Sequence, residues 1–159
     1  MCIRDRHHAA GCVRRLISGL DGASHALQLD DGATLAVQIG VHRDPHNRDQ
    51  QKLLLDFHGT SQQQQGNFNA PLSVTRAVVL YVIRCLLDDD IPLNEGCFAP
   101  LELRVPLGCL LNPEAPAAVV AGNVEVSQAL CNLLFGAFGV LAAGPVSYTH
   151  LTLPTILRV

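Results

Sequence analysis

Several features that mark common functional classes are missing from this chain. It contains no Gly-x-x-x-x-Gly-Lys-Ser/Thr loop, so the commonest nucleotide-binding motif is absent. Its net charge of −3 at pH 7 lacks the basic footprint of a nucleic-acid-binding protein. Its apolar runs are interrupted well short of the roughly 20 residues that a transmembrane helix needs. We therefore expect a soluble protein of one ordinary domain's length, without a nucleic-acid or membrane partner.

The cysteines argue against two kinds of stabilising centre. The sequence has 6 cysteines and no Cys-x-x-Cys pair. Setting aside Cys2, which lies in an end segment discussed next, leaves an odd number at wide spacing, so neither a zinc cluster nor a disulfide framework is indicated. Three of them lie in apolar surroundings and are better explained as small buried side chains. Free cysteines favour the reducing cytoplasm as the compartment.

The two ends of the chain resemble translated adapter DNA. Residues 1–5 can be encoded by ATG TGT ATA AGA GAC, and the reverse complement of that string encodes residues 146–150. Such an inverted repeat belongs to nucleotide sequence and resembles a transposon-derived sequencing adapter. We therefore expect residues 1–6 and 146–159 to be non-native and to pack poorly against a body formed by residues 7–145. The alternatives are chance and a native terminal strand near the C-terminal end.

Alternating apolar residues predict the strands. A β-hairpin is predicted over 26–29 and 34–41 around the turn Asp30-Asp31-Gly32. A third strand is predicted over 53–57, and a short one over 101–105.

Longer apolar segments predict the helices, over 10–20, over 74–87, and from about 123–127 through 134. Ser73 is the expected N-cap of the second helix. That helix is apolar on nearly every face, so we expect it to be buried, with Val78, Tyr81, Val82 and Cys85 in the core. Antiparallel strands followed by buried helices predict an α+β fold, with mixed α/β as the alternative, and a fragment of a larger domain.

Polar and small residues are concentrated in four clusters, which the apolar segments separate. Each cluster combines glycine or proline with Asn, Asp, Glu or Ser, which is how loops around a binding site are usually built. The clusters cover residues 56–60, 66–71, 90–97 and 121–128.

These clusters, in this order and spacing, resemble the B-type half of the hydantoinase B/5-oxoprolinase family, and most closely its ATP-dependent 5-oxoprolinases. The matching strings are Asp-Phe-x-Gly-Thr, Gly-Asn-Phe-Asn-Ala-Pro, Asp-Ile-Pro-Leu-Asn-x-Gly-Cys and Ala-Ala-Val-Val-Ala-Gly-Asn-Val-Glu-x-Ser-Gln. The resemblance covers roughly residues 22–143. It is specific because four multi-residue motifs coincide, whereas any single one would be a weak signal.

The fourth cluster stands where a helix is expected to start. Free backbone N–H groups and the positive end of the helix dipole suit such a turn to a carboxylate or phosphate. On the residues alone, Asn123 as a helix cap is the favoured explanation. With the resemblance, Asn123, Ser127 and Gln128 become candidates for a substrate pocket.

The second and third clusters supply further pocket candidates. Asn67 and Asn69 could hold a ring amide or order a loop. Asn94 is a candidate of the same kind. Glu95 is a weaker candidate as a general acid or base, and Cys97 could be a nucleophile, although a turn with a buried cysteine is the better explanation.

The first cluster supplies weaker candidates. Asp56 and His58 lie two apart on a strand and so face the same side, which is compatible with sharing a proton or a metal. The resemblance gives this pair little support. Thr60 completes the weaker candidates. We assign no metal ligand in this chain and leave the catalytic residues open.

The resemblance implies a hydrolase that opens 5-oxo-L-proline to L-glutamate with ATP, a reaction of glutathione metabolism. It implies a partner, the hydantoinase A/oxoprolinase-type ATP-binding half, present as a subunit or a fused domain, and an oligomer. ATP and a divalent metal are expected to bind outside this chain, which alone should be inactive. The alternatives are a hydantoin hydrolase subunit and a non-catalytic interface module. Convergence of Asn67, Asn69, Asn94 and Asn123 on one cleft would favour the pocket over the interface module.

Overall fold

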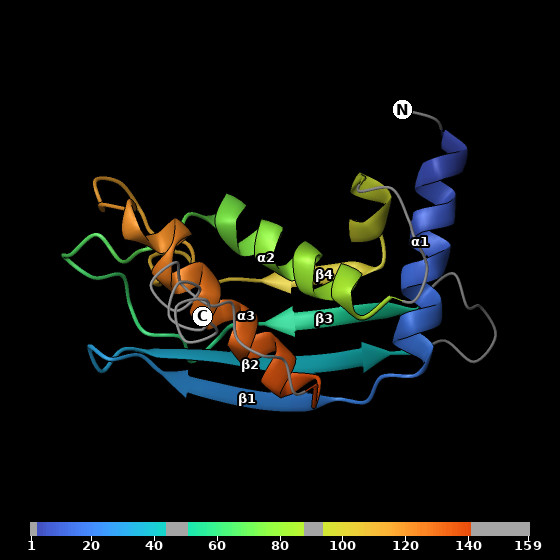
Figure 1. The fold of residues 1–159 in the computed structure, drawn as a ribbon, viewed down its shortest axis with the longest axis horizontal. Coiled ribbons are helices and arrows are strands. Elements are labelled where there is room, and N and C mark those ends of the chain that lie inside the picture. Colours follow the sequence, from blue (N-terminus) through green and yellow to red (C-terminus); the bar gives the residue numbers. More distant parts are fainter. Residues whose placement is uncertain (1–2, 44–50, 88–93, 141–159) are drawn as a thin grey trace, which may run out of the picture.

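The computed structural model describes residues 3–43, 51–87 and 94–140. Four strands form one sheet in the order β1-β2-β3-β4 (Figure 1). Helices α2 and α3 pack together on the sheet, α3 lies against β1 and β2, and α1 lies against the short helix η2. The elements are α1 Ile3–Ser18, β1 Ala23–Gln28, β2 Thr34–His42, β3 Lys52–Asp56, α2 Leu72–Cys85, η2 Glu95–Phe98, β4 Leu101–Arg104, η3 Ala121–Asn123 and α3 Glu125–Ala137.

The predicted α+β class and the hairpin are confirmed. Strands β1 and β2 pair antiparallel around a turn in which Gly32 has a φ of 87°, a conformation that glycine adopts at little cost. The side chain of Asp31 closes this turn, because its Oδ1 accepts a hydrogen bond of 2.9 Å from the backbone N–H of Ala33. Strand β1 begins at Ala23, earlier than predicted.

The sheet is mixed rather than purely antiparallel. Strand β3 pairs antiparallel with β2 but parallel with β4. Helix α2 lies between β3 and β4 in the sequence, and such a helical crossover returns the chain in its original direction. The carboxyl ends of β3 and β4 therefore meet at the same end of the sheet (Figure 1).

The core lies between the sheet and the two helices α2 and α3. Alternate residues of the central strands face it, whereas intervening residues such as Gln38 and Glu102 face the other side of the sheet. Val82 and Leu130 bring the two helices into the same cluster. Its fully buried large side chains include Leu35, Leu53, Leu55, Phe57, Ile83, Leu130, Leu133 and Leu134.

Helix α2 is not buried on nearly every face. Val78 and Val82 are buried as predicted, but Tyr81 is 57% exposed and Cys85 is also exposed. The helix lies on the core along one stripe, so apolar residues on its opposite side remain outside. Ser73 is not the N-cap, because the helix begins at Leu72 after Pro71 and has no side-chain cap.

Helix α3 also starts differently from the prediction. It runs from Glu125 to Ala137, and Val124 rather than Asn123 occupies the N-cap position. The short helix η3 precedes it and contains Asn123, so the chain turns once before α3 begins. Gly136 does not break α3. It allows close packing, since a Cβ there would lie 2.6 Å from Nε2 of His25.

Helix α1 begins at Ile3 rather than near residue 10, and so includes four residues of the end that the sequence predicts to be non-native. The side chains of residues 3–6 are exposed. Residues 146–159 lie outside the described residues, and the non-native origin of both ends stays a prediction.

Most of the described cysteines are small buried side chains. Cys12, Cys97, Cys109 and Cys131 are buried thiols outside any disulfide, whereas Cys85 is exposed. Burial, with Cys85 nearby, raises the pKa of Cys131 to about 11, so its thiol is a poor nucleophile at neutral pH. In the three ranges that the structure describes, no helix has the length and apolar character needed to cross a bilayer.

Candidate functional site

A groove lies at the end of the sheet where β3 and β4 terminate. It has a volume of about 590 Å³ and draws on the β1–β2 hairpin turn, the second cluster and the first half of α3. We call it the carboxyl-end groove. In sheets with parallel strands, ligands bind outside the carboxyl ends of those strands. Its lining residues are Leu27, Gln28, Leu29, Asp30, Asp31, Asn67, Phe68, Ala121, Glu125, Val126, Gln128, Ala129 and Asn132.

Two loops interlock to build this end of the molecule, one after β3 and one after β4. The backbone N–H of Ala70 donates to the carbonyl of Leu110 at 2.8 Å, and that of Leu110 donates to Ser61 at 2.9 Å. The N–H of Ala121 donates to the carbonyl of Asn67 at 2.9 Å. The second and fourth clusters are therefore joined directly by the backbone hydrogen bond between Ala121 and Asn67.

Asn69 holds these loops and does not face the groove. It is fully buried, and its Oδ1 accepts a hydrogen bond of 2.7 Å from the N–H of Gln64. Its amide nitrogen donates to the carbonyls of Gln64, Gly66 and Ala118 at 2.9 to 3.0 Å. Every polar atom of the side chain is thus engaged within the protein, which matches the loop-ordering alternative.

Gly122 lets the two clusters approach closely. A Cβ at this position would overlap the backbone carbonyl of Asn69 and would lie 2.7 Å from Cα of Ala70. Only glycine can occupy this position without displacing the neighbouring loop.

Helix α3 presents polar side chains to the groove. Glu125, Gln128 and Asn132 are spaced three and four residues apart, so they share one face of the helix. Gln128 was predicted as a pocket residue, and its position beside Asn67 in the groove lining brings two predicted residues together.

Asn123 and Ser127 lie next to the groove without lining it. The hydroxyl of Ser127 donates to the carbonyl of Asn123 at 2.8 Å and to that of Val124 at 3.3 Å. Asn123 itself is exposed. Ser127 therefore satisfies backbone carbonyls at the start of α3, and the side chain of Asn123 is accessible.

Asp56 and His58 interact, as their spacing predicted. Nδ1 of His58 lies 2.6 Å from Oδ1 of Asp56, and the backbone N–H of His58 donates to the same oxygen at 2.9 Å. Burial raises the pKa of Asp56, but the hydrogen bonds from His58 and the charges of His58 and Arg104 outweigh it and lower the pKa overall. His58 is 73% exposed in its side chain.

Thr60 belongs to the scaffold rather than to a pocket. It is buried, and its hydroxyl exchanges two hydrogen bonds of 3.2 Å with the backbone of Ala36 on β2.

The described part of the third cluster, residues 94–97, lies at the opposite end of the sheet, against α1 (Figure 1). Asn94 is the N-cap of η2, where its side chain accepts from the N–H of Gly96 at 2.7 Å. Glu95 is exposed, and its Oε2 lies 3.8 Å from Nη2 of Arg76. Cys97 is completely buried, which matches the explanation as a buried turn cysteine. Residues 90–93 lie outside the described residues. The four asparagines therefore do not converge on one cleft.

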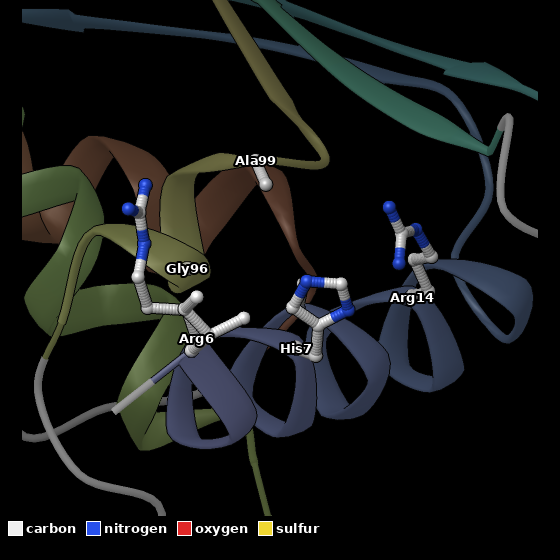
Figure 2. Close-up of a pocket in the computed structure, with 7 residues that line it drawn as sticks. Arg6, His7, Arg14, Gly96 and Ala99 are labelled. Carbon is white, nitrogen blue, oxygen red and sulfur yellow. The ribbon is translucent and has the colours of Figure 1, made fainter. Parts of the chain in front are cut away.

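A smaller pocket of about 330 Å³ lies between α1 and η2. Figure 2 shows Arg6, His7 and Arg14 of α1 around it, with Gly96 and Ala99 on the other side. These basic side chains suggest anion binding. However, Ile3 and Arg6 belong to the end predicted to be non-native, so the pocket gives no basis for a native anion site.

The described residues do not fit a nucleotide or a metal ion at the carboxyl-end groove. The groove lining contains no Lys, Arg or His to bind a triphosphate. Across residues 3–43, 51–87 and 94–140, no group of three or more His, Cys, Asp or Glu residues is placed to hold a metal ion.

Several groove residues were not predicted as site residues. Glu125 and Asn132 could have been found from their helical spacing with Gln128. Asp30 and Asp31 had a sufficient explanation as turn residues, and their proximity to α3 depends on tertiary packing.

Comparison with known proteins finds relatives that are named 5-oxoprolinases. The chain is 41% identical to 5-oxoprolinase of Saccharomyces cerevisiae over 115 residues, which cover 72% of this chain and 9% of that protein. It is also 41% identical to 5-oxoprolinase 1 of Arabidopsis thaliana over 124 residues, 78% of this chain and 9% of that protein. The chain thus spans about a tenth of the length of these curated relatives.

Two solved structures share the fold at 16% identity. A nucleotide-free acetone carboxylase matches with a TM-score of 0.63, over 83% of this chain and 19% of its own. The ATP-dependent caprolactamase from Pseudomonas jessenii matches with a TM-score of 0.53, over 83% of this chain and 24% of its own. The family model described as Hydantoinase B/oxoprolinase matches residues 5–156. The chain belongs to the hydantoinase B/oxoprolinase family.

Proposed function

We propose that this chain is part of an ATP-dependent cyclic amide hydrolase, and that the carboxyl-end groove forms one wall of its substrate pocket. The proposed reaction opens 5-oxo-L-proline to L-glutamate. Family membership supports the reaction class, and the names of the relatives from yeast and Arabidopsis support the substrate. The observation that carries the location is the groove itself, because it unites side chains of two separate sequence motifs, Asn67 and Gln128.

The groove suits the ring of a lactam chemically. A lactam has a hydrogen-bonding C=O and N–H on an otherwise apolar ring. The amides of Asn67, Gln128 and Asn132 can both donate and accept, and the partly exposed Phe68 and Leu29 offer apolar contacts.

The phosphate chemistry belongs elsewhere in the assembly. An unactivated lactam is a poor electrophile, and ATP supplies a better leaving group by phosphorylating its oxygen. Because the described residues fit neither a triphosphate nor a metal cluster, we place ATP with the hydantoinase A/oxoprolinase-type half and a divalent metal outside this chain. That half is either a separate subunit or a fused domain, in a cytoplasmic oligomer.

Replacing groove amides tests the location. In a full-length protein that carries this chain, we expect Asn67→Ala and Gln128→Ala to lower the catalytic efficiency toward 5-oxoproline by about a hundredfold, the typical loss for a group that orients or stabilises the reacting molecule. The thermal midpoint should change little, since both residues lie at the surface of the groove. Gln38→Ala, on the other side of the sheet, is the matched control. Normal turnover in both groove variants would overturn the location.

The same assay tests Asn123. Its exposed side chain is not the helix cap. We therefore expect Asn123→Ala to lower the turnover of 5-oxoproline while the thermal midpoint stays close to that of the wild type. Near-normal turnover would place Asn123 in a purely structural role.

A hydantoin is the alternative substrate, and steady-state rates for 5-oxoproline and hydantoin in the same protein decide between them. A non-catalytic interface module is the alternative class. Because the four asparagines do not converge on one cleft and Asn94 caps a separate element at the opposite end of the sheet, these residues favour the interface module, whereas the presence of Asn67 and Gln128 in the lining of one groove favours the pocket.

A further inference from the structure

The charged side chains that line the carboxyl-end groove all have the same sign. Asp30 and Asp31 come from the hairpin turn, and Glu125 comes from the first turn of α3. No basic residue is among the lining residues to neutralise them. Asp31 is fixed in place, because its Oδ1 accepts from Ala33 and its Oδ2 accepts from Nε2 of Gln64, each at 2.9 Å. The groove therefore has a negative electrostatic potential.

The negative charge of the groove acts differently on the ring N–H of a substrate such as 5-oxoproline and on its carboxylate. The ring N–H can donate to carboxylate and amide oxygens, and a face of the ring can pack on apolar residues such as Phe68 and Leu29. The carboxylate of 5-oxoproline, in contrast, would meet like charges. A like charge at close range is unfavourable even where water screens part of the interaction.

We propose that the groove receives the ring N–H of a cyclic amide, packs against one face of the ring and repels negatively charged substituents, so that the carboxylate of 5-oxoproline, on the carbon next to that nitrogen, points out of the groove. This inference rests on the proposed function and names the part of the substrate that the groove recognises. Glu125 is the principal residue that sets this preference. It shares a helix face with Gln128 and Asn132, and its exposed side chain tolerates an isosteric change.

The test compares two lactams that differ only in the carboxylate, 5-oxo-L-proline and 2-pyrrolidinone. Both are assayed in a full-length protein that carries this chain, as wild type, Glu125→Gln and Asp30→Asn. Glu102→Gln is the control, since Glu102 faces the other side of the sheet. The readouts are ATP-dependent hydrolysis and equilibrium binding of each lactam.

We expect Glu125→Gln to raise the preference for 5-oxoproline over 2-pyrrolidinone about three- to tenfold relative to wild type, in both binding and catalytic efficiency. This is the size of effect expected when one repulsive charge several ångströms away is removed in partly aqueous surroundings. Asp30→Asn should shift the ratio in the same direction, and Glu102→Gln should leave it unchanged. An unchanged ratio in both groove variants, or a shift toward 2-pyrrolidinone, overturns the inference.

The two readouts separate this inference from the proposed function. If neither lactam is hydrolysed but the binding ratio shifts as expected, the inference stands and the reaction is wrong. If 5-oxoproline is hydrolysed but the ratio does not move, the reaction stands and the inference is wrong. Failure of the protein to bind either lactam overturns both.

Discussion

The buried side-chain amide of Asn69 donates a hydrogen bond of 2.9 Å to the backbone carbonyl of Ala118, which lies 49 residues further along the chain. Because the same amide also holds Gln64 and Gly66, one side chain joins the loop after β3 to the loop after β4. The backbone of Asn67 and the start of α3 are positioned by this junction. The geometry of the groove thus depends on a residue that does not line it.

Asn69→Asp tests that junction. The substitution keeps the shape of the side chain but replaces the amide donor with an oxygen, which would face three carbonyl oxygens. Leaving buried acceptors unpaired costs about 1 to 3 kcal/mol each, so we expect a clear fall in the thermal midpoint. Hydrogen exchange should also speed up at the N–H of Gln64. The exposed Asn67→Asp is the control, and an equally small effect of both changes would contradict the role of Asn69.

Gly122→Ala and Gly11→Ala form a matched pair. A Cβ at Gly122 would overlap the carbonyl of Asn69, so the two loops must separate, and we expect a lower thermal midpoint. A Cβ at Gly11, inside α1, meets no atom within 4 Å, and alanine favours a helix interior by about 1 kcal/mol. Gly11→Ala should therefore preserve or raise the midpoint. Similar responses at both positions would mean that Gly122 is not sterically required.

Adjacent residues of α2 should respond differently to truncation. Val82 is completely buried, so Val82→Ala should lower the free energy of unfolding by about 1 to 3 kcal/mol through lost contacts and a cavity. Tyr81 is 57% exposed, and Tyr81→Ala should cost less than Val82→Ala. Chemical denaturation of both variants measures the difference. A cost well under about 1 kcal/mol at Val82 would show that this position is not core.

Asp56 should make stability depend on pH. Its pKa in the folded protein is below the usual value, so its ionised form is stabilised by folding. This contribution is complete above the usual Asp pKa of about 3.9 and is lost as the pH falls through the lower folded value. The stability difference between wild type and Asp56→Asn should therefore shrink below about pH 4. A difference that does not change with pH in that range would contradict the assignment.

Local signals in the sequence were sufficient for much of the architecture. The alternation of apolar residues predicted β2 and β3 because one face of each strand is buried, and Asp31 and Gly32 marked the hairpin turn through their own backbone requirements. The four clusters identified the family because their residue types are specified position by position. Asn67 was predicted as a polar residue of a loop, and Gln128 was predicted through the family resemblance; both line the groove.

Tertiary structure alone decided how these parts meet. Local patterns in the sequence do not predict that β4 pairs parallel with β3, because the strand order depends on how α2 packs. Asn67 and Asn69 are only two residues apart, yet Asn67 lines the groove, whereas the side chain of Asn69 is buried and donates to the loop after β4. Asp30 and Glu125 line the same groove because the hairpin turn and α3 meet only in the folded chain. Helix and strand periodicity acts over a few residues, whereas contacts between distant segments exist only after the core has packed.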